Sequence, residues 1–235
     1  MDYLRRSEER GSANFGWLDS KHSFSFGHYY DPKHMGVSAL RVINDDTVAP
    51  GAGFDTHGHQ NMEIISYILE GEIAHKDSTG NDYTIPAGEV QRMSAGRGVT
   101  HSEFNASKEV PLKFLQIWIQ PNQMNIEPDY EQRAIEQTEA LTPLVTPDGE
   151  GNSLYIHQNA RIYRLRLEAG EGIELHSRGS HAYLHSISGS AEVTSNQNKT
   201  LLGAGDALGG ALATGQSVNV KTQDEPYEAL WFELP

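Results

Sequence analysis

Short runs of β-branched, aromatic and other apolar residues recur along the whole chain, separated by clusters of glycine, asparagine, aspartate and proline. Runs of this length between turn-forming residues are typical of β-strands. The clearest are SALRVI, EIISYIL and KFLQIWI in the first half and RIYRLRL, AYLHSI and ALWFEL in the second. The pattern predicts an all-β fold, built as a sandwich or barrel.

One segment near the middle of the chain departs from this pattern. Residues 130–145, YEQRAIEQTEALTPLV, have a helix-forming composition and little apolar periodicity. A helix without an apolar face has nothing to bury against a core. We therefore expect a short surface helix or an extended linker here.

The two halves of the chain repeat one pattern of glycines at an offset of 117–119 residues. Gly51 and Gly170 are each followed by a histidine at the same spacing, His57 and His176. The other matched pairs are Gly71 with Gly189, Gly88 with Gly205, and Gly98 with Gly215. Such a repeat predicts two β-barrel, jelly-roll-like units in tandem. We place them at residues 1–135 and 136–235.

The composition narrows the chemistry of the chain. It has 235 residues and no cysteine, so disulfides and thiolate metal sites are excluded. Its formal charge of −14 disfavours direct binding to nucleic acid. No stretch approaches the ~20 apolar residues of a membrane helix, and the first residues lack the apolar core of a signal peptide. We expect a soluble cytoplasmic protein without membrane contact.

Two pairs of candidate metal ligands stand 44 residues apart, each beside glycines. The first pair is His57 and His59, and the second is His101 and Glu103. Residues i and i+2 of a strand point to the same face, so neighbouring strands would bring all four side chains together. This set suits one divalent transition metal per chain, such as iron, nickel, copper, manganese or zinc, with one or two positions open. A single pair alone would more often be a solvated loop.

The segment GAGFDTHGHQNMEIISYILEG resembles the first motif of the cupins, a glycine, His-x-His, a glutamate and a closing glycine. The second cupin motif is split between GNDYTIPAGE and GRGVTHSEFN. A plain cupin would have a histidine three residues after Gly88, where Gln91 stands. This departure, together with the later His101 and Glu103, resembles the pirin branch of the cupin superfamily.

Two further segments, RGSANFGWLDSKHSFSFGHYYDP and ALRVINDD, are also similar to pirins, so the likeness covers the whole first half. The second half is alike by architecture alone. In pirins the carboxylate ligand is the residue that matches Glu103, whereas many other cupins use the glutamate that matches Glu63. The resemblance therefore gives Glu63 a role in packing or in orienting a ligand.

The resemblance implies a metal-dependent dioxygenase that cleaves quercetin or a related flavonol with O2, and it places iron first among the metals. Glu103 would stay a ligand or act as the catalytic base on the flavonol hydroxyl. Phe54, Met62, Phe104 and Phe114 are available to line a pocket, although core packing is their ordinary role. Pirins are also known as regulatory partners of transcription factors or metabolic enzymes, so a protein partner stays open as the alternative.

The second half lacks the ligand set. The offset places Arg178, Val218 and Val220 at three of the four ligand positions and retains only His176. We expect this unit to keep the fold without a metal. The remaining histidines that we considered are interpreted as packing or rim residues (His22, His28, His34) or as isolated (His75, His157).

Overall fold

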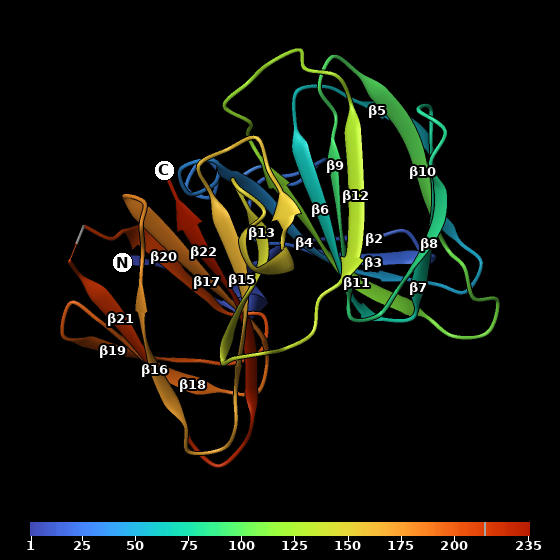
Figure 1. The fold of residues 1–235 in the computed structure, drawn as a ribbon. Helices are drawn as coiled ribbons and strands as arrows, with labels where there is room; N and C mark the ends of the chain where they lie inside the picture. Colours follow the sequence, from blue (N-terminus) through green and yellow to red (C-terminus); the bar gives the residue numbers. More distant parts are fainter. Residues whose placement is uncertain (214) are drawn as a thin grey trace.

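The computed structural model describes residues 1–213 and 215–235. Within them the regular structure consists of strands and two short 3-10 turns, η1 (Ser7–Glu9) and η2 (Glu150–Asn152). The predicted all-β fold is confirmed (Figure 1). In this part of the chain no helix has the length and apolar character needed to cross a membrane.

The N-terminal half is a sandwich of a seven-stranded and a four-stranded sheet. The larger sheet has the order β12 (Asp129–Ala134), β9 (Glu89–Ser94), β6 (Glu63–Glu70), β11 (Leu112–Ile119), β4 (Leu40–Val48), β3 (Leu18–His22) and β2 (Gly11–Asn14). The smaller sheet has the order β5 (Gly53–His59), β10 (Val99–Asn105), β7 (Glu72–Asp77) and β8 (Asp82–Pro86).

The C-terminal half repeats this arrangement. Its larger sheet has the order β1 (Tyr3–Arg5), β20 (Ala207–Ala211), β17 (His181–Ser188), β22 (Tyr227–Leu234), β15 (Arg161–Leu167), β13 (Leu141–Thr146) and β14 (Leu154–Tyr155). Its smaller sheet has the order β16 (Gly172–His176), β21 (Ser217–Thr222), β18 (Ala191–Ser195) and β19 (Asn198–Leu202). Each unit is a pair of jelly-roll sheets rather than a closed barrel.

The repeat inferred from the glycines is present in the backbone. All eight matched glycines have a positive φ, which costs glycine little and other residues more. The pair Gly88 and Gly205 shows the correspondence: the amide of Gly88 donates to the carbonyl of Ile68 in β6, and that of Gly205 donates to the carbonyl of Ser186 in β17. The repeated sequence thus encodes the same tight turns twice.

The two large sheets pack against each other through their outer faces. One buried apolar cluster joins Ile65 and Ile117 of the first half to Ile162 and Phe232 of the second. The two small sheets lie on the far sides, so the molecule has four sheet layers (Figure 1). The inner space of each sandwich is therefore separate from the joint between the halves.

The segment from residue 130 to 145 is not a helix, so that part of our expectation is wrong. Most of β12 lies in it and pairs along the free edge of β9, and β13 begins at Leu141. Ile135, Leu144 and Val145 are buried in the cluster between the halves. Helix propensity stabilises a segment less per residue than interstrand hydrogen bonds and burial of apolar surface do. The segment therefore pairs with the sheet edge instead of forming a helix.

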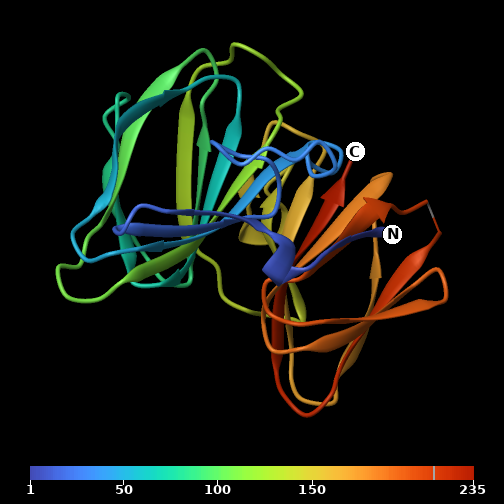
Figure 2. The same cartoon turned by 180° about the vertical axis from the view of Figure 1, so that it is seen from behind.

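The first strand of the chain belongs to the second unit. Tyr3 of β1 lies opposite Gly209 of β20, and the N-terminal amine donates to Ser195. Figure 2 shows the N-terminus beside the strands of the second half. Arg6, which follows β1, pairs with Asp206 at 2.7 Å. The start of the chain therefore completes the sheet of the C-terminal half, as β12 completes that of the N-terminal half.

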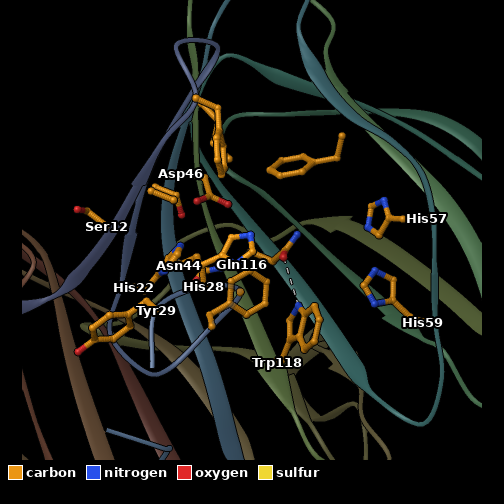
Figure 3. Close-up of a pocket in the computed structure, with 17 residues that line it drawn as sticks. Ser12, His22, His28, Tyr29, Asn44, Asp46, His57, His59, Gln116 and Trp118 are labelled. Carbon is orange, nitrogen blue, oxygen red and sulfur yellow. Dashed lines mark hydrogen bonds between the residues drawn. The ribbon is translucent and has the colours of Figure 1, made fainter. Parts of the chain in front are cut away.

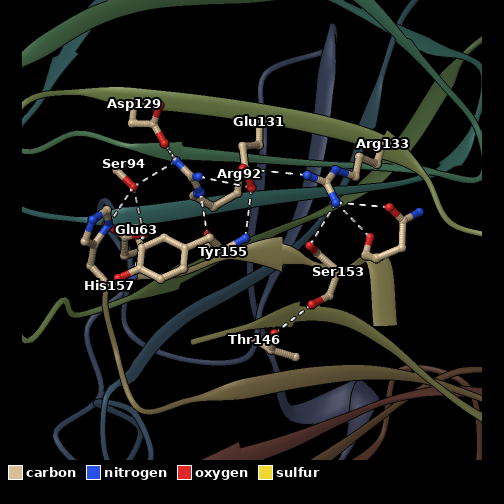
Figure 4. A network of polar contacts seen from close by, with 11 residues as sticks. Glu63, Arg92, Ser94, Asp129, Glu131, Arg133, Thr146, Ser153, Tyr155 and His157 are labelled. Atoms are coloured by element: carbon tan, nitrogen blue, oxygen red, sulfur yellow. Dashed lines mark hydrogen bonds and ion pairs between the residues drawn. The ribbon is translucent and has the colours of Figure 1, made fainter. Parts of the chain in front are cut away.

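A buried arginine ties the halves together at one end of their joint. Arg92 on the outer face of β9 has a fully buried side chain, and its Nε donates to the Tyr155 carbonyl at 2.7 Å (Figure 4). Its Nη1 donates to Ser94 at 3.0 Å and to Asp129 at 2.8 Å. Its Nη2 lies 3.2 Å from Glu131. Strands from both halves are thus held by one guanidinium group.

Replacing Arg92 by alanine should lower the free energy of unfolding by about 2–4 kcal/mol, because buried polar partners lose their hydrogen bonds together. Urea denaturation of the two proteins measures this difference. Arg97→Ala is the matched control, since Arg97 and Glu127 form an exposed pair at 2.8 Å, and exposed pairs contribute ~0–1 kcal/mol. Equal losses in the two variants would contradict the role given to Arg92.

Candidate metal centre

Two strands of the small N-terminal sheet carry the candidate ligands. β5 and β10 pair antiparallel, with His57 directly opposite His101 and His59 opposite Val99. The alternation of buried and accessible residues along β10 turns His101 and Glu103 toward the inside of the sandwich. A bulge between these two residues shifts the register, so that Glu103 lies opposite Phe54. The predicted proximity of the two strands is confirmed.

The three histidines point their Nε2 atoms at one another. The Nε2 of His101 lies 3.1 Å from that of His57 and 3.0 Å from that of His59. One shared proton cannot satisfy three converging lone pairs, whereas a metal ion binds all three. Two ligands at a right angle, each with a bond of about 2.1 Å, lie about 3.0 Å apart. Both distances to His101 fit neighbouring positions around one ion, and His57, His59 and His101 each offer a ring nitrogen within 4.8 Å of the other two.

The surroundings orient His57 and keep His59 and His101 neutral. The Nδ1 of His57 donates to the backbone carbonyl of Asp55 at 2.7 Å, which leaves the Nε2 lone pair free. Burial, and then the neighbouring histidines, lowers the pKa of His59 to about 4 and that of His101 to about 2. Neutral imidazole is the form that binds a metal, so both residues are ready at neutral pH.

Glu103 is buried and is fixed by the opposite sheet. Its two carboxylate oxygens accept hydrogen bonds from Gln116 at 3.0 Å and Ser66 at 3.4 Å. One of its oxygens lies within 4.8 Å of a ring nitrogen of His101 and of one of His75, and the three residues form a second group of candidate ligands. Burial raises the pKa of Glu103 to about 7. His101 is therefore shared by the histidine group and the carboxylate group.

His75 is the residue of this site that our sequence reasoning missed. It is buried on β7 directly opposite Glu103, and its ring centre lies 5.3 Å from that of His101. Its Nε2 bonds Asp77 at 3.0 Å, and its Nδ1 lies 3.2 Å from the amide of Gln91. Gln91 stands where a plain cupin has a histidine. The i, i+2 pair of His75 and Asp77 was the sequence signal that would have identified His75.

A row of buried polar side chains crosses the inner face of the large sheet opposite the histidines. Successive strands place these residues side by side in the register: His22, Asn44, Gln116, Ser66 and Gln91. All five are buried, although the inner face of a sandwich is ordinarily apolar. In the second half the corresponding row, matched by its place in the sheet, is apolar: Tyr163, Trp231, Leu184 and Leu208.

A cavity of about 560 Å³ opens onto His57 and His59 (Figure 3). Its aromatic walls are Phe15, Phe26, Tyr29, Phe54 and Trp118. Of the four side chains that we expected to line a pocket, Phe54 does so. Phe114 and Met62 belong to apolar packing clusters, and Phe104 is not among the lining residues identified in the described chain. His22 and His28 are part of the lining, as expected for rim residues.

Glu63 does not orient a ligand. It accepts a hydrogen bond from Ser94 at 2.9 Å and one from the backbone amide of His157 at 3.4 Å, on the side facing the second half (Figure 4). The packing role is the one that the structure supports. We expected His157 to be isolated, but its Nδ1 lies 3.5 Å from the buried carboxylate of Glu63.

The second half places apolar side chains where the first has ligands. Val218 and Val220 are buried in its core, and His176 at the end of β16 is exposed. Within residues 1–213 and 215–235, the groups of potential ligands all lie in the first half. The absence of a metal from the C-terminal unit stays a prediction.

Comparison with known protein families gives two matches. Residues 4–119 match the pirin family model, and residues 143–234 match the model of the quercetinase C-terminal cupin domain. A quercetin 2,3-dioxygenase of Escherichia coli K12 is 44% identical over 236 residues, covering 100% of this chain and 99% of its own. The chain belongs to the pirin family. It is a quercetinase-type cupin with two domains.

Solved pirin structures share the fold along the whole chain. The bacterial pirin YhhW of Escherichia coli in complex with nickel(II) has a TM-score of 0.90 and 42% identity, covering 99% of this chain and 98% of that one. YhaK, another Escherichia coli protein, has a TM-score of 0.77 and 32% identity, covering 96% and 98%. A metal is thus bound by a pirin of the same fold, which supports one divalent metal in this pirin.

Replacing both His57 and His101 by alanine should reduce the metal content from about one ion per chain to none, because two of the proposed ligands are lost. Elemental analysis of purified protein measures the content. His176→Ala is the control, since this residue holds the position of His57 in the second half, and its metal content should be unchanged. Stoichiometric metal in the double variant, or a loss in the control, would move the site elsewhere.

Metal affinity should rise with pH, because the raised pKa of Glu103, about 7, means that the carboxyl holds a proton below neutrality. A metal ion competes with that proton, so affinity increases up to pH ~7 and then levels off for this group. Between pH ~5 and ~7 the logarithm of the affinity should rise more steeply with pH in the wild type than in Glu103→Gln. The two slopes should differ by about one log unit per pH unit, which corresponds to the release of one proton on binding. Calorimetric titration with nickel(II) measures both slopes. Parallel slopes would remove Glu103 from the site.

Proposed function

We propose that this pirin is a metal-dependent dioxygenase that cleaves quercetin or a related flavonol with O2. The observation that carries the proposal is an aromatic-walled cavity opening directly onto two of three converging imidazoles. A flat polycyclic ligand needs apolar walls and a few fixed polar groups, and this cavity has both. The name of the Escherichia coli relative, quercetin 2,3-dioxygenase, points to the same chemistry.

His57, His59, His101 and Glu103 are the proposed ligands, and iron is the first metal to test, before nickel, copper, manganese and zinc. A divalent ion at this position supplies a Lewis acid for the hydroxyl and keto oxygens of the flavonol. Both atoms of O2 enter the product, and one carbon of the central ring leaves as carbon monoxide.

Glu103 has the acidity for moving the flavonol proton, and its hydrogen-bond donor Gln116 lines the cavity. Burial raises its pKa to about 7, so near neutrality it exchanges a proton readily. Gln116 and Ser66 hold its oxygens in place from the opposite sheet. Trp118, whose Nε1 donates to Gln116 at 3.3 Å, links this arrangement to the cavity wall.

Flavonol loss and carbon monoxide release should both require air and metal. In an assay that follows flavonol absorbance, turnover should stop under nitrogen and in the variant with both His57 and His101 replaced by alanine. At saturating metal, Glu103→Gln should be slower by about 10²–10⁴-fold, the range for loss of a general base. A rate near that of the wild type would leave Glu103 as a ligand alone.

Equal rates in air and nitrogen would reject the dioxygenase assignment. The alternative is a regulatory protein whose metal state controls binding to a transcription factor or a metabolic enzyme. Such a protein should show no turnover and should hold a defined partner with an affinity that changes on chelation. His57 and His59 are half-buried, so they connect the metal position to the protein surface. In the regulatory alternative, a change in the metal would reach a protein partner through these two residues.

A further inference from the structure

The wall of the cavity facing the histidines is built from the polar side chains of two strands. On β3 and β4, Ser20 lies directly opposite Asp46, and His22 lies directly opposite Asn44. All four line the cavity, and Figure 3 shows Asp46 and Asn44 across the space from His57 and His59. The wall is thus part of the same cavity as the metal position but comes from a different sheet.

Three atoms of this wall have no hydrogen-bond partner in the described chain: Nδ1 of His22, Oδ1 of Asn44 and Oδ1 of Asp46. Their residues are 4%, 2% and 2% exposed. A buried polar atom without a partner costs about 1–3 kcal/mol, and native proteins hold few of them. Three together on one cavity wall indicate groups arranged for a ligand.

The wall is not used to hold the proposed metal ligands. Gln116 and Ser66, further along the same row, donate hydrogen bonds to Glu103. Oδ1 of Asn44 and Nδ1 of His22, at the other end of the row, have no such partner in the described chain. His22 is held between aromatic rings, 5.4 Å from that of Phe26 at an interplanar angle of 74°. The polar groups are therefore fixed in position and directed at the cavity.

The chemistry of the wall selects its ligand. A carboxyl and a carboxamide offer oxygen acceptors, and His22, whose pKa is lowered chiefly by burial, offers a neutral imidazole. Neither lysine nor arginine is among the residues identified as lining the cavity, so this wall offers no cationic side chain to a phosphate or carboxylate group. Hydroxyl groups on a flat aromatic ring supply the missing donors and suit the aromatic walls.

We propose that Asn44 and Asp46, assisted by His22, form a recognition site for the phenolic hydroxyls on an aryl ring of the substrate. The proposal deepens the proposed function and rests on it, because it assumes that the central ring of the ligand faces His57 and His59. An aryl ring without hydroxyls would leave the buried acceptors unpaired, so the site rejects such a ligand. The metal position recognises the central ring, and this wall recognises its substituents.

Binding of two ligands tests the proposal on nickel(II)-loaded protein under nitrogen. Quercetin carries hydroxyls on its aryl rings, whereas 3-hydroxyflavone keeps the central hydroxyl and keto oxygen and lacks all the others. Calorimetric titration gives the two Kd values and their ratio for each variant. The ratio removes any change that affects both ligands equally, such as altered metal content.

In Asn44→Leu the preference for quercetin over 3-hydroxyflavone should fall at least about tenfold, because a site built around hydroxyls loses an acceptor. Asp46→Asn keeps the shape of the side chain, and the titrations are made at about pH 8, because burial raises the pKa of Asp46 to about 7 and the carboxyl is ionised above it. The variant should lower the ratio about threefold or more, since a neutral amide is a weaker acceptor than a carboxylate. Thr47→Val is the control, because Thr47 lies between Asp46 and Val48 on the opposite face of β4 and does not line the cavity. Its ratio should equal that of the wild type.

An unchanged ratio in both Asn44→Leu and Asp46→Asn, with native melting temperatures, would overturn the recognition site. So would a wild-type protein that binds the two ligands equally. Turnover in air, measured separately, distinguishes the two ideas. Flavonol cleavage without discrimination rejects this site alone, whereas discrimination that depends on Asn44 without any cleavage rejects the dioxygenase and keeps the site.

Discussion

The antiparallel pairing of β5 with β10 is the interaction on which the site depends. It sets His57 opposite His101 and, through one bulge, turns Glu103 to the same inner face. A slip of one residue in either strand would send the side chains to the opposite face, because strand side chains alternate. The pairing therefore determines the fold of the small sheet, and it brings the Nε2 atoms of His57 and His59 within 3.1 Å of that of His101.

The polar row on the facing sheet shows what this site requires of the fold. Ser66 and Gln116 bond Glu103, Gln91 bonds His75, and the row continues to Asn44 at the cavity. Burying so many polar groups is unfavourable unless each has a partner. The second half has the same strands with an apolar row and a continuous core. One copy of the repeat is thus specialised for chemistry and the other for packing.

Stability and chemistry are also separated within the first half. Along β9, Gln91 faces His75 on the inside, while its neighbour Arg92 joins the second half on the outside. Period-two alternation lets one strand serve both faces. The outer face meets the apolar cluster shared by the two large sheets, so the inner face is free to remain polar and to enclose a cavity.

The sequence by itself determined the all-β class, the duplication, and the candidate ligands His57, His59, His101 and Glu103, since glycine turns and i, i+2 pairs are local signals. Residues 130–145 show the limit, because a free sheet edge overrides weak helix propensity. Only the tertiary structure decided that His75 lies opposite Glu103 and that the polar residues from His22 to Gln91 form one row. These residues come from separate strands, and their proximity follows from long-range register, which no local pattern encodes.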